Sequence, residues 1–293
     1  MNALPFLRPS LLVAWGRCPQ MVRHFYIDQR RVPPGIAVTF GKAIHKTVLE
    51  LDQQSRIDGK GYRPISELKE AFHADFQKEF EYVDPSDPDA LRLGGHEKAF
   101  GTYTNQGVSL LDRYNENRDV VAGRSVETPI EVPFADTVLK GTMDVDIDDV
   151  SFTDIKTRDF SKPRARKQTL SNIQYRRQYQ AYSAAKAKLT GKVDQYVNES
   201  NWYKCDKPFI EQSTIVNGPA QHEYIEGVAL EINKSINAGS FPPVDKSSQM
   251  AWVCSQKFCG MWPETLVDGS KGCPFGQRGA VSMSLPNNSE ESV

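Results

Sequence analysis

The chain has 293 residues and a mass of 32.9 kDa, which is long enough for one large domain with appendages or for two small domains. Its 36 Lys and Arg residues nearly balance 37 Asp and Glu residues, so any nucleic acid would have to bind where positive charge is concentrated locally. No stretch approaches the roughly 18 to 20 apolar residues that cross a bilayer, and residues 1 to 9 lack the regions of a secretory signal. We therefore expect a cytoplasmic protein with no membrane segment.

The first part of the chain predicts helices. Ser10 has the side chain of a helix N-cap, and residues 11 to 26 follow as a helical run that Pro19 kinks or restarts. Further helical patterns occupy residues 39 to 51, 64 to 82 and 90 to 114, separated by turn sequences.

The second part predicts strands and two long helices. Strands are expected at residues 127 to 134, 138 to 148, 150 to 157, 193 to 202 and 209 to 216, with helices at 171 to 189 and 221 to 238. This order predicts the α/β fold class, with a mixed central sheet flanked by helices. Residues 276 to 293 are small, polar and acidic, which predicts a disordered tail.

Residues 141 to 156 carry the main functional signal. In the first strand of this hairpin, apolar residues (Met143, Val145, Ile147) alternate with carboxylates (Asp144, Asp146, Asp148). On the second strand, Asp154 and Lys156 are two apart and share a face. Two carboxylates and a lysine on adjacent strands could hold Mg²⁺ or Mn²⁺, which can acidify a water and stabilise a phosphoryl oxygen. An isolated Asp-x-Lys is common, and a solvated acidic hairpin is the simpler alternative.

The wider pattern resembles a known family. Asp144, Asp154-Ile155-Lys156, and the pair Gln178 and Tyr182 on the following helix are similar to the motifs of the PD-(D/E)XK nuclease superfamily. Upstream, Gly41 to His45 resembles the G-x-x-x-H helix of its RecB-like exonuclease branch. That branch includes the CRISPR-associated and AddB-type nucleases, some of which carry an iron–sulfur cluster.

The resemblance implies roles for these residues. The metal ligands would be His45, Asp144, Asp154 and the carbonyl oxygen of Ile155. Lys156 would face the attacked phosphate, and Gln178 and Tyr182 would bind DNA and arrange the catalytic groups. Asp146 competes with Asp144 for the ligand position, although the spacing from Gly141 favours Asp144. The region from Lys156 to Arg177 has eight basic residues against one acidic residue, which suits phosphate contacts.

Cysteines form a second pattern. In the resembling iron–sulfur nucleases one cysteine precedes the core and three follow it, as do Cys18, Cys254, Cys259 and Cys273 here. The resemblance implies a [4Fe–4S] cluster, with Zn²⁺ as the alternative because the gaps between the last three differ from the tightest family pattern. Cys205 is left as a buried thiol.

We therefore expect a single nuclease domain at residues 1 to 275, followed by the tail. Within it, residues 35 to 120 would be a helical insertion or lid, 121 to 216 the catalytic core and 241 to 275 the cysteine-rich segment. The expected function is metal-dependent DNA exonuclease activity on ends or single strands, in recombination, repair, phage DNA metabolism or CRISPR adaptation. No Walker A sequence is present, so a recombination, helicase or CRISPR adaptation partner could supply the DNA. The alternatives are a sequence-specific endonuclease on the same core and a non-catalytic DNA-binding or assembly subunit.

Overall fold

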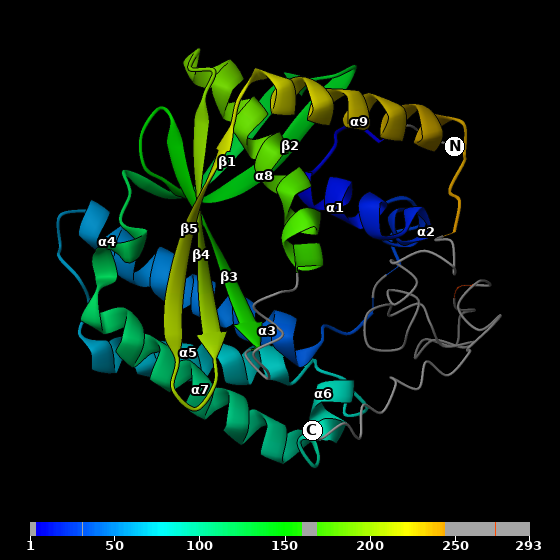
Figure 1. Ribbon diagram of the computed structural model, residues 1–293. Coiled ribbons are helices and arrows are strands. Elements are labelled where there is room, and N and C mark those ends of the chain that lie inside the picture. Colours follow the sequence, from blue (N-terminus) through cyan, green and yellow to red (C-terminus); the bar gives the residue numbers. More distant parts are fainter. Residues whose placement is uncertain (1–3, 31, 160–168, 244–272, 274–293) are drawn as a thin grey trace, which may run out of the picture.

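A five-stranded mixed sheet forms the centre of the molecule (Figure 1). The computed structural model describes residues 4–30, 32–159, 169–243 and 273, with the backbone alone for 169–174. The strands are β1 (Ser125–Phe134), β2 (Thr137–Asp146), β3 (Ser151–Asp159), β4 (Gln195–Lys204) and β5 (Phe209–Asn217). They lie side by side in chain order; β3 and β4 are parallel and are joined through helix α8 (Thr169–Thr190), and the other neighbours are antiparallel. The predicted mixed sheet is confirmed.

Helices cover both faces of this sheet. Those that precede it are α1 (Pro9–Arg17), α2 (Pro19–Val22), α3 (Ile36–His45), α4 (Gln54–Ile57), α5 (Ile65–Phe80), α6 (Pro88–Arg92) and α7 (His96–Glu116). Between them lie two π-helical segments, η1 (Arg23–Ile27) and η2 (Lys46–Gln53), and a 3-10 turn, η3 (Arg118–Val121), leads into β1. Helix α9 (Pro219–Asn237) follows β5. Among the described residues, none of the helices has the length and apolar character needed to cross a membrane.

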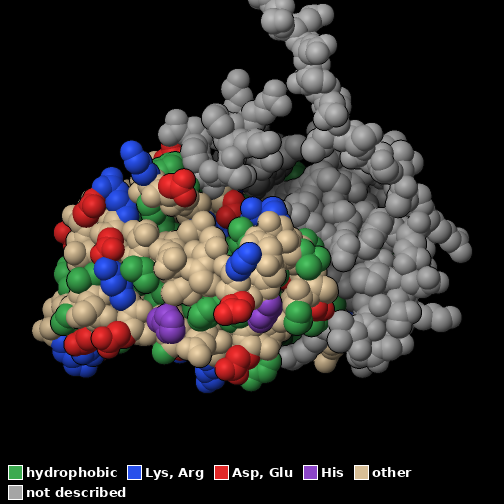
Figure 2. Space-filling model, turned by 90° about the horizontal axis from the view of Figure 1, so that it is seen from below, with side chains coloured by type: hydrophobic (Ala, Val, Ile, Leu, Met, Phe, Trp, Pro, Cys, Tyr) green, Lys and Arg blue, Asp and Glu red, His purple; other side chains and the backbone are tan. Residues whose placement is uncertain are grey.

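Each face of the sheet has its own hydrophobic core. On one face, Phe152 and Val197 pack with α1, α8 and α9. On the other face, Ile155 and Trp202 pack with α3, α5 and α7. The first face is the upper right of Figure 1 and the second is the lower left. On the described part of the surface seen from below, Lys and Arg side chains are interspersed with Asp and Glu side chains (Figure 2).

Two of the predicted helices are interrupted. The run expected at residues 11 to 26 breaks at Cys18, which is extended because the residue before a proline is disfavoured in the helical region. This helix also begins at Pro9, with Arg8 rather than Ser10 as its N-cap. The helix expected at residues 90 to 114 is divided at Gly94 and Gly95, whose φ angles of 89° and 114° are incompatible with a helix.

The regular alternation predicted for β2 is wrong at Asp144. Met143 packs on the α8 side of the sheet, whereas Val145 and Ile147 pack on the α3 side. Asp144 therefore marks a change of face. Directly opposite it on β1, Glu127 has a φ angle of 46°, which residues other than glycine rarely adopt. The distortion lies at the residue that the sequence predicts as a metal ligand.

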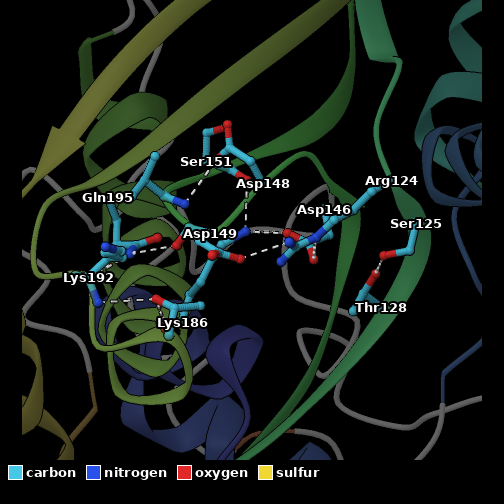
Figure 3. Close-up of polar contacts among 12 residues, drawn as sticks. Arg124, Ser125, Thr128, Asp146, Asp148, Asp149, Ser151, Lys186, Lys192 and Gln195 are labelled. Carbon is cyan, nitrogen blue, oxygen red and sulfur yellow. Dashed lines mark hydrogen bonds and ion pairs between the residues drawn. The ribbon is translucent and has the colours of Figure 1, made fainter.

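A buried ion pair fixes the hairpin that joins β2 to β3 (Figure 3). The ammonium of Lys186 on α8, whose side chain is 2% exposed, donates to the carboxylate of Asp146 on β2. It also donates to the carbonyl oxygen of Ser151 on β3 over 2.8 Å. Arg124 contacts the other oxygen of Asp146 at 2.9 Å. Lys186 thus ties both strands of the hairpin to the same helix.

Candidate active site

The candidate site lies where β2 and β3 separate. The described pairing between these strands consists of Val145 with Thr153 and Asp146 with Phe152. Beyond those pairs the carboxylate of Asp144 takes the place of a backbone partner and accepts a hydrogen bond of 2.7 Å from the N–H of Ile155. This bond holds the Asp144 carboxylate between the two strands.

Helix α3 brings His45 to the same place. Helix α3 can approach β3 closely because Gly41 has no Cβ; one built there would lie 3.0 Å from the hydroxyl oxygen of Thr157. Nε2 of His45 is 3.0 Å from the carbonyl oxygen of Ile155, and because a carbonyl only accepts, this imidazole nitrogen donates. Nδ1 of His45 is 3.8 Å from a carboxylate oxygen of Asp144. The chain continues from His45 as the π-helical segment η2, a form of helix that is frequent at functional sites.

Glu127 is a candidate ligand that the sequence reasoning missed. Ligand-type atoms of His45, Glu127 and Asp144 all lie within 4.8 Å of one another. Burial raises the pKa of Glu127, and the charge of Asp144 raises it further. Concentrated negative charge beside an imidazole suits a divalent cation. A glutamate near the start of a strand resembles a solvent-facing residue in sequence, and the positive φ of Glu127 leaves no sequence signal.

Asp154 and Lys156 form a tight pair beside this group. Nζ of Lys156 is 2.5 Å from the carboxylate of Asp154, and the two side chains are 18% and 2% exposed. Burial raises the pKa of Asp154 to about 6; the positive charge of Lys156 lowers it and the negative charge of Asp144 raises it. Burial lowers the pKa of Lys156, but the charges of Asp154 and Asp144 outweigh this effect, so the pKa rises and the ammonium stays charged. Asp154 is therefore turned toward Lys156.

A second layer of polar groups supports this pair and was also missed. Glu199 lies opposite Asp154 in the parallel β3–β4 ladder, and both carboxylates are about 2% exposed. The hydroxyl of Tyr179 on α8 donates to Glu199 over 2.8 Å and lies 3.3 Å from Asp154. Arg158 also donates to Glu199 over 2.8 Å and to the side chain of Asn201. Two buried carboxylates are thus matched by two cations on the same face of β3, Lys156 and Arg158.

The predicted pair on α8, Gln178 and Tyr182, reaches β2 through Tyr182. The hydroxyl of Tyr182 donates to the carbonyl oxygen of Thr142 over 2.7 Å and also interacts with the side chain of Gln178. Gly141 makes room for this contact, since a Cβ there would lie 2.9 Å from the Tyr182 ring. Burial raises the pKa of Tyr182 to about 12, so the phenol stays neutral. Tyr182 therefore contacts the strand that carries Asp144, and Gln178 lies beside Tyr182.

The structure separates the two aspartates that competed for the ligand position. Asp144 faces His45 and the backbone of β3. Asp146 is bound instead by Lys186 and Arg124 (Figure 3). That Asp146 is only a flanking charge stays a prediction.

The cysteine prediction falls largely outside the described residues. Cys18 is buried at the break between α1 and α2, and Cys273 is partly exposed. Cys254, Cys259 and the predicted tail at residues 276 to 293 lie outside the part that the structure describes. Cys205 is partly exposed in the β4–β5 loop, with its Sγ 3.0 Å from the carbonyl oxygen of Lys207, so it is not the buried thiol that was expected.

Comparisons with known proteins find similarity in fold and none in sequence. No family profile and no curated protein matches the sequence. The fold is similar to that of a solved protein from Eubacterium rectale named "Putative exonuclease". The two have a TM-score of 0.52 and 12% sequence identity, and the match covers 84% of this chain and 86% of the other. At this identity the similarity concerns the fold alone.

Proposed function

We propose that this chain is a metal-dependent DNA nuclease that acts as an exonuclease on DNA ends or single strands. The observation that carries the proposal is the group at the β2–β3 fork, where His45, Glu127 and Asp144 lie beside the Asp154–Lys156 pair. The similarity in fold to a protein named as an exonuclease is consistent with it.

The residues present fit a divalent cation. Their donor set is one imidazole and two carboxylates, a combination that suits Mn²⁺ or Mg²⁺. The Ile155 carbonyl accepts from Nε2 of His45 and would join the cation after that hydrogen bond breaks. Asp154 would complete the set of ligands after turning away from Lys156. A cation bound there would lower the pKa of a water and stabilise charge on a phosphoryl oxygen.

The chain's own groups would do the remaining work. Lys156 keeps its charge and would offset the negative charge that develops on the attacked phosphate. The hydroxyl of Tyr179 lies 3.3 Å from Asp154 and donates to Glu199, so it would limit the movement of the Asp154 side chain. Gln178 and Tyr182 would steady the DNA strand from α8. The sign of each group matches its role, because the carboxylates face the cation and the ammonium faces the phosphate.

End-labelled DNA gives a direct test. Single- and double-stranded DNA should be digested only with Mg²⁺ or Mn²⁺, and Asp154→Ala or Asp144→Asn should lower the rate by roughly a hundredfold or more. Asp206→Asn, which changes an exposed carboxylate in the β4–β5 loop, is the matched control and should retain full activity.

The form of the DNA separates the alternatives. An exonuclease spares closed circles, whereas a sequence-specific endonuclease cuts them into discrete fragments. If the wild-type protein binds DNA with metal present and never cuts it, the catalytic proposal fails and a DNA-binding or assembly subunit is the better description.

The finer assignments belong to the same proposal. Three of them rest on the sequence resemblance: membership of the RecB-like branch, a role in recombination, repair, phage DNA metabolism or CRISPR adaptation, and a partner that supplies DNA. So does a [4Fe–4S] cluster or Zn²⁺ held by Cys18, Cys254, Cys259 and Cys273. Iron and sulfide analysis after anaerobic purification, compared with zinc content, would decide between the two metals.

A further inference from the structure

Three cationic side chains converge on one aromatic ring beside the candidate active site. The ring belongs to Tyr175 on α8, which is partly exposed. Nζ of Lys156 and Cζ of Arg158 lie 5.2 and 5.6 Å from its centre. Cζ of Arg17, in the last turn of α1, lies 5.7 Å from the same point. Two segments far apart in the chain thus bring positive charge to one spot.

Arg158 is held in a fixed orientation at this spot. Its Nε donates to the side chain of Asn201, and its Nη2 donates to Glu199 over 2.8 Å. Both acceptors are buried on β4, and the Arg158 side chain remains 17% exposed. A guanidinium anchored on two of its nitrogens is preorganised, so less conformational entropy is lost when it binds an anion.

Lys156 links two groups of opposite charge. Its ammonium interacts with the charge of Asp144, which lies with Glu127 and His45 in the group that suits a cation. Its Nζ also lies near the Tyr175 ring, around which Arg17 and Arg158 lie. A nucleic-acid strand that placed one phosphodiester at Lys156 would bring a neighbouring phosphate toward these two arginines.

We propose that Arg17, Arg158 and Tyr175 form a binding subsite for the backbone phosphate next to the phosphodiester that is hydrolysed. Arg17 and Arg158 contact the phosphate oxygens, and the Tyr175 ring packs against the adjoining sugar or base. Glu199 and Asn201 are positioning residues that act through Arg158. This subsite rests on the proposed nuclease function for its placement, but its binding of DNA can be measured without cleavage.

Salt dependence of binding is the test. The affinity for a labelled single-stranded oligonucleotide would be measured with Ca²⁺ in place of Mg²⁺, at several salt concentrations. Each phosphate contact contributes about 0.7 to the slope of log K against log salt for single strands. Arg17→Gln should therefore lower the magnitude of the slope by about 0.7 and weaken binding by about tenfold. Arg113→Gln, on the α7 side of the molecule, is the matched control and should change neither value.

A second pair of variants separates charge from geometry. Arg158→Lys keeps the charge but loses the two-point anchor, so it should leave the slope unchanged and weaken binding. Arg158→Gln should reduce the slope as Arg17→Gln does. Arg17→Gln carries the test if Arg158→Gln fails to fold, because Arg17 is partly exposed at the end of a helix.

The outcomes distinguish this subsite from the nuclease proposal. If Arg17 only stabilises the end of α1, Arg17→Gln would change the melting temperature and leave the salt slope unaltered, and this result would overturn the subsite. A wild-type protein that binds no DNA would overturn it as well. If the slopes change as expected and no metal supports cleavage, the subsite stands and the nuclease proposal fails.

Discussion

Replacing Lys186 by Met should make the β2–β3 hairpin easier to unfold, because Lys186 is a buried cation that joins Asp146 on β2 to Ser151 on β3. Breaking a buried ion pair by removing one partner costs about 3–5 kcal/mol. Methionine keeps the apolar stem, and Arg124 still contacts Asp146 at 2.9 Å, so the lower end applies. We expect a loss of about 3 kcal/mol in the free energy of unfolding, which lowers the melting temperature by roughly 6–12 °C for a domain of this size.

Urea and thermal unfolding of matched variants would measure this loss. Lys188→Met is the control on the same helix, because the Lys188 side chain is 39% exposed and its pair with Glu226 is a surface pair worth less than about 1 kcal/mol. Asp146→Asn combined with Lys186→Met should cost less than the sum of the two single changes, since the two groups interact. A loss below about 1 kcal/mol for Lys186→Met would refute the reasoning. At a temperature where both proteins are folded, the variant should also be slower in the proposed nuclease activity, because the hairpin positions Asp144 and Asp154.

Two further predictions concern packing and the cation. Gly107→Ala should lower the free energy of unfolding by about 1–3 kcal/mol, because the new Cβ would lie 2.1 Å from the Phe72 ring. Gly101→Ala on the same helix is the control: its Cβ meets nothing within 4 Å, so it should raise the free energy of unfolding by up to about 1 kcal/mol. Equal melting temperatures for the two variants would contradict this reasoning. Burial raises the pKa of Asp154 to about 6 and also that of Glu127, and protons compete with a cation for carboxylates. The affinity for Mn²⁺, measured by calorimetry, should therefore be constant above about pH 7 and fall by up to about tenfold per pH unit below pH 6. An affinity that does not vary from pH 5 to 8 would count against the proposed cation site.

Much of the fold could be predicted because local patterns determine it. The five strands and the helices α5, α8 and α9 follow the periodicity of apolar residues, to within a few residues at their ends. The helix breaks at Cys18 and at Gly94–Gly95 were harder, because a proline or glycine within a periodic segment can bend it or divide it. Here both segments divide.

Spacing along the chain could bring candidate-site residues together only where they share a strand or a helix, whereas His45 and Asp144 were named from the family resemblance. Asp154 and Lys156 are two apart on β3, and Gln178 and Tyr182 are four apart on α8, so spacing alone places each pair together. Glu127 and Glu199 reach the site through the register of β1 against β2 and of β3 against β4. Register is a property of paired strands, and the residues of one strand do not reveal it.

The distance along the chain between the parts of the site affects how the protein folds. Nε2 of His45 contacts the carbonyl oxygen of Ile155, a residue 110 positions later in the chain. Strand β3 also pairs with β4, which follows α8 in the chain. Contacts between residues so far apart form slowly, whereas the helices of residues 36–116 depend mainly on nearby residues. We therefore expect the candidate site to assemble late in folding. A chain whose synthesis stops before residue 204 would have most of the described helices without this site, and such incomplete copies should lack the proposed nuclease activity.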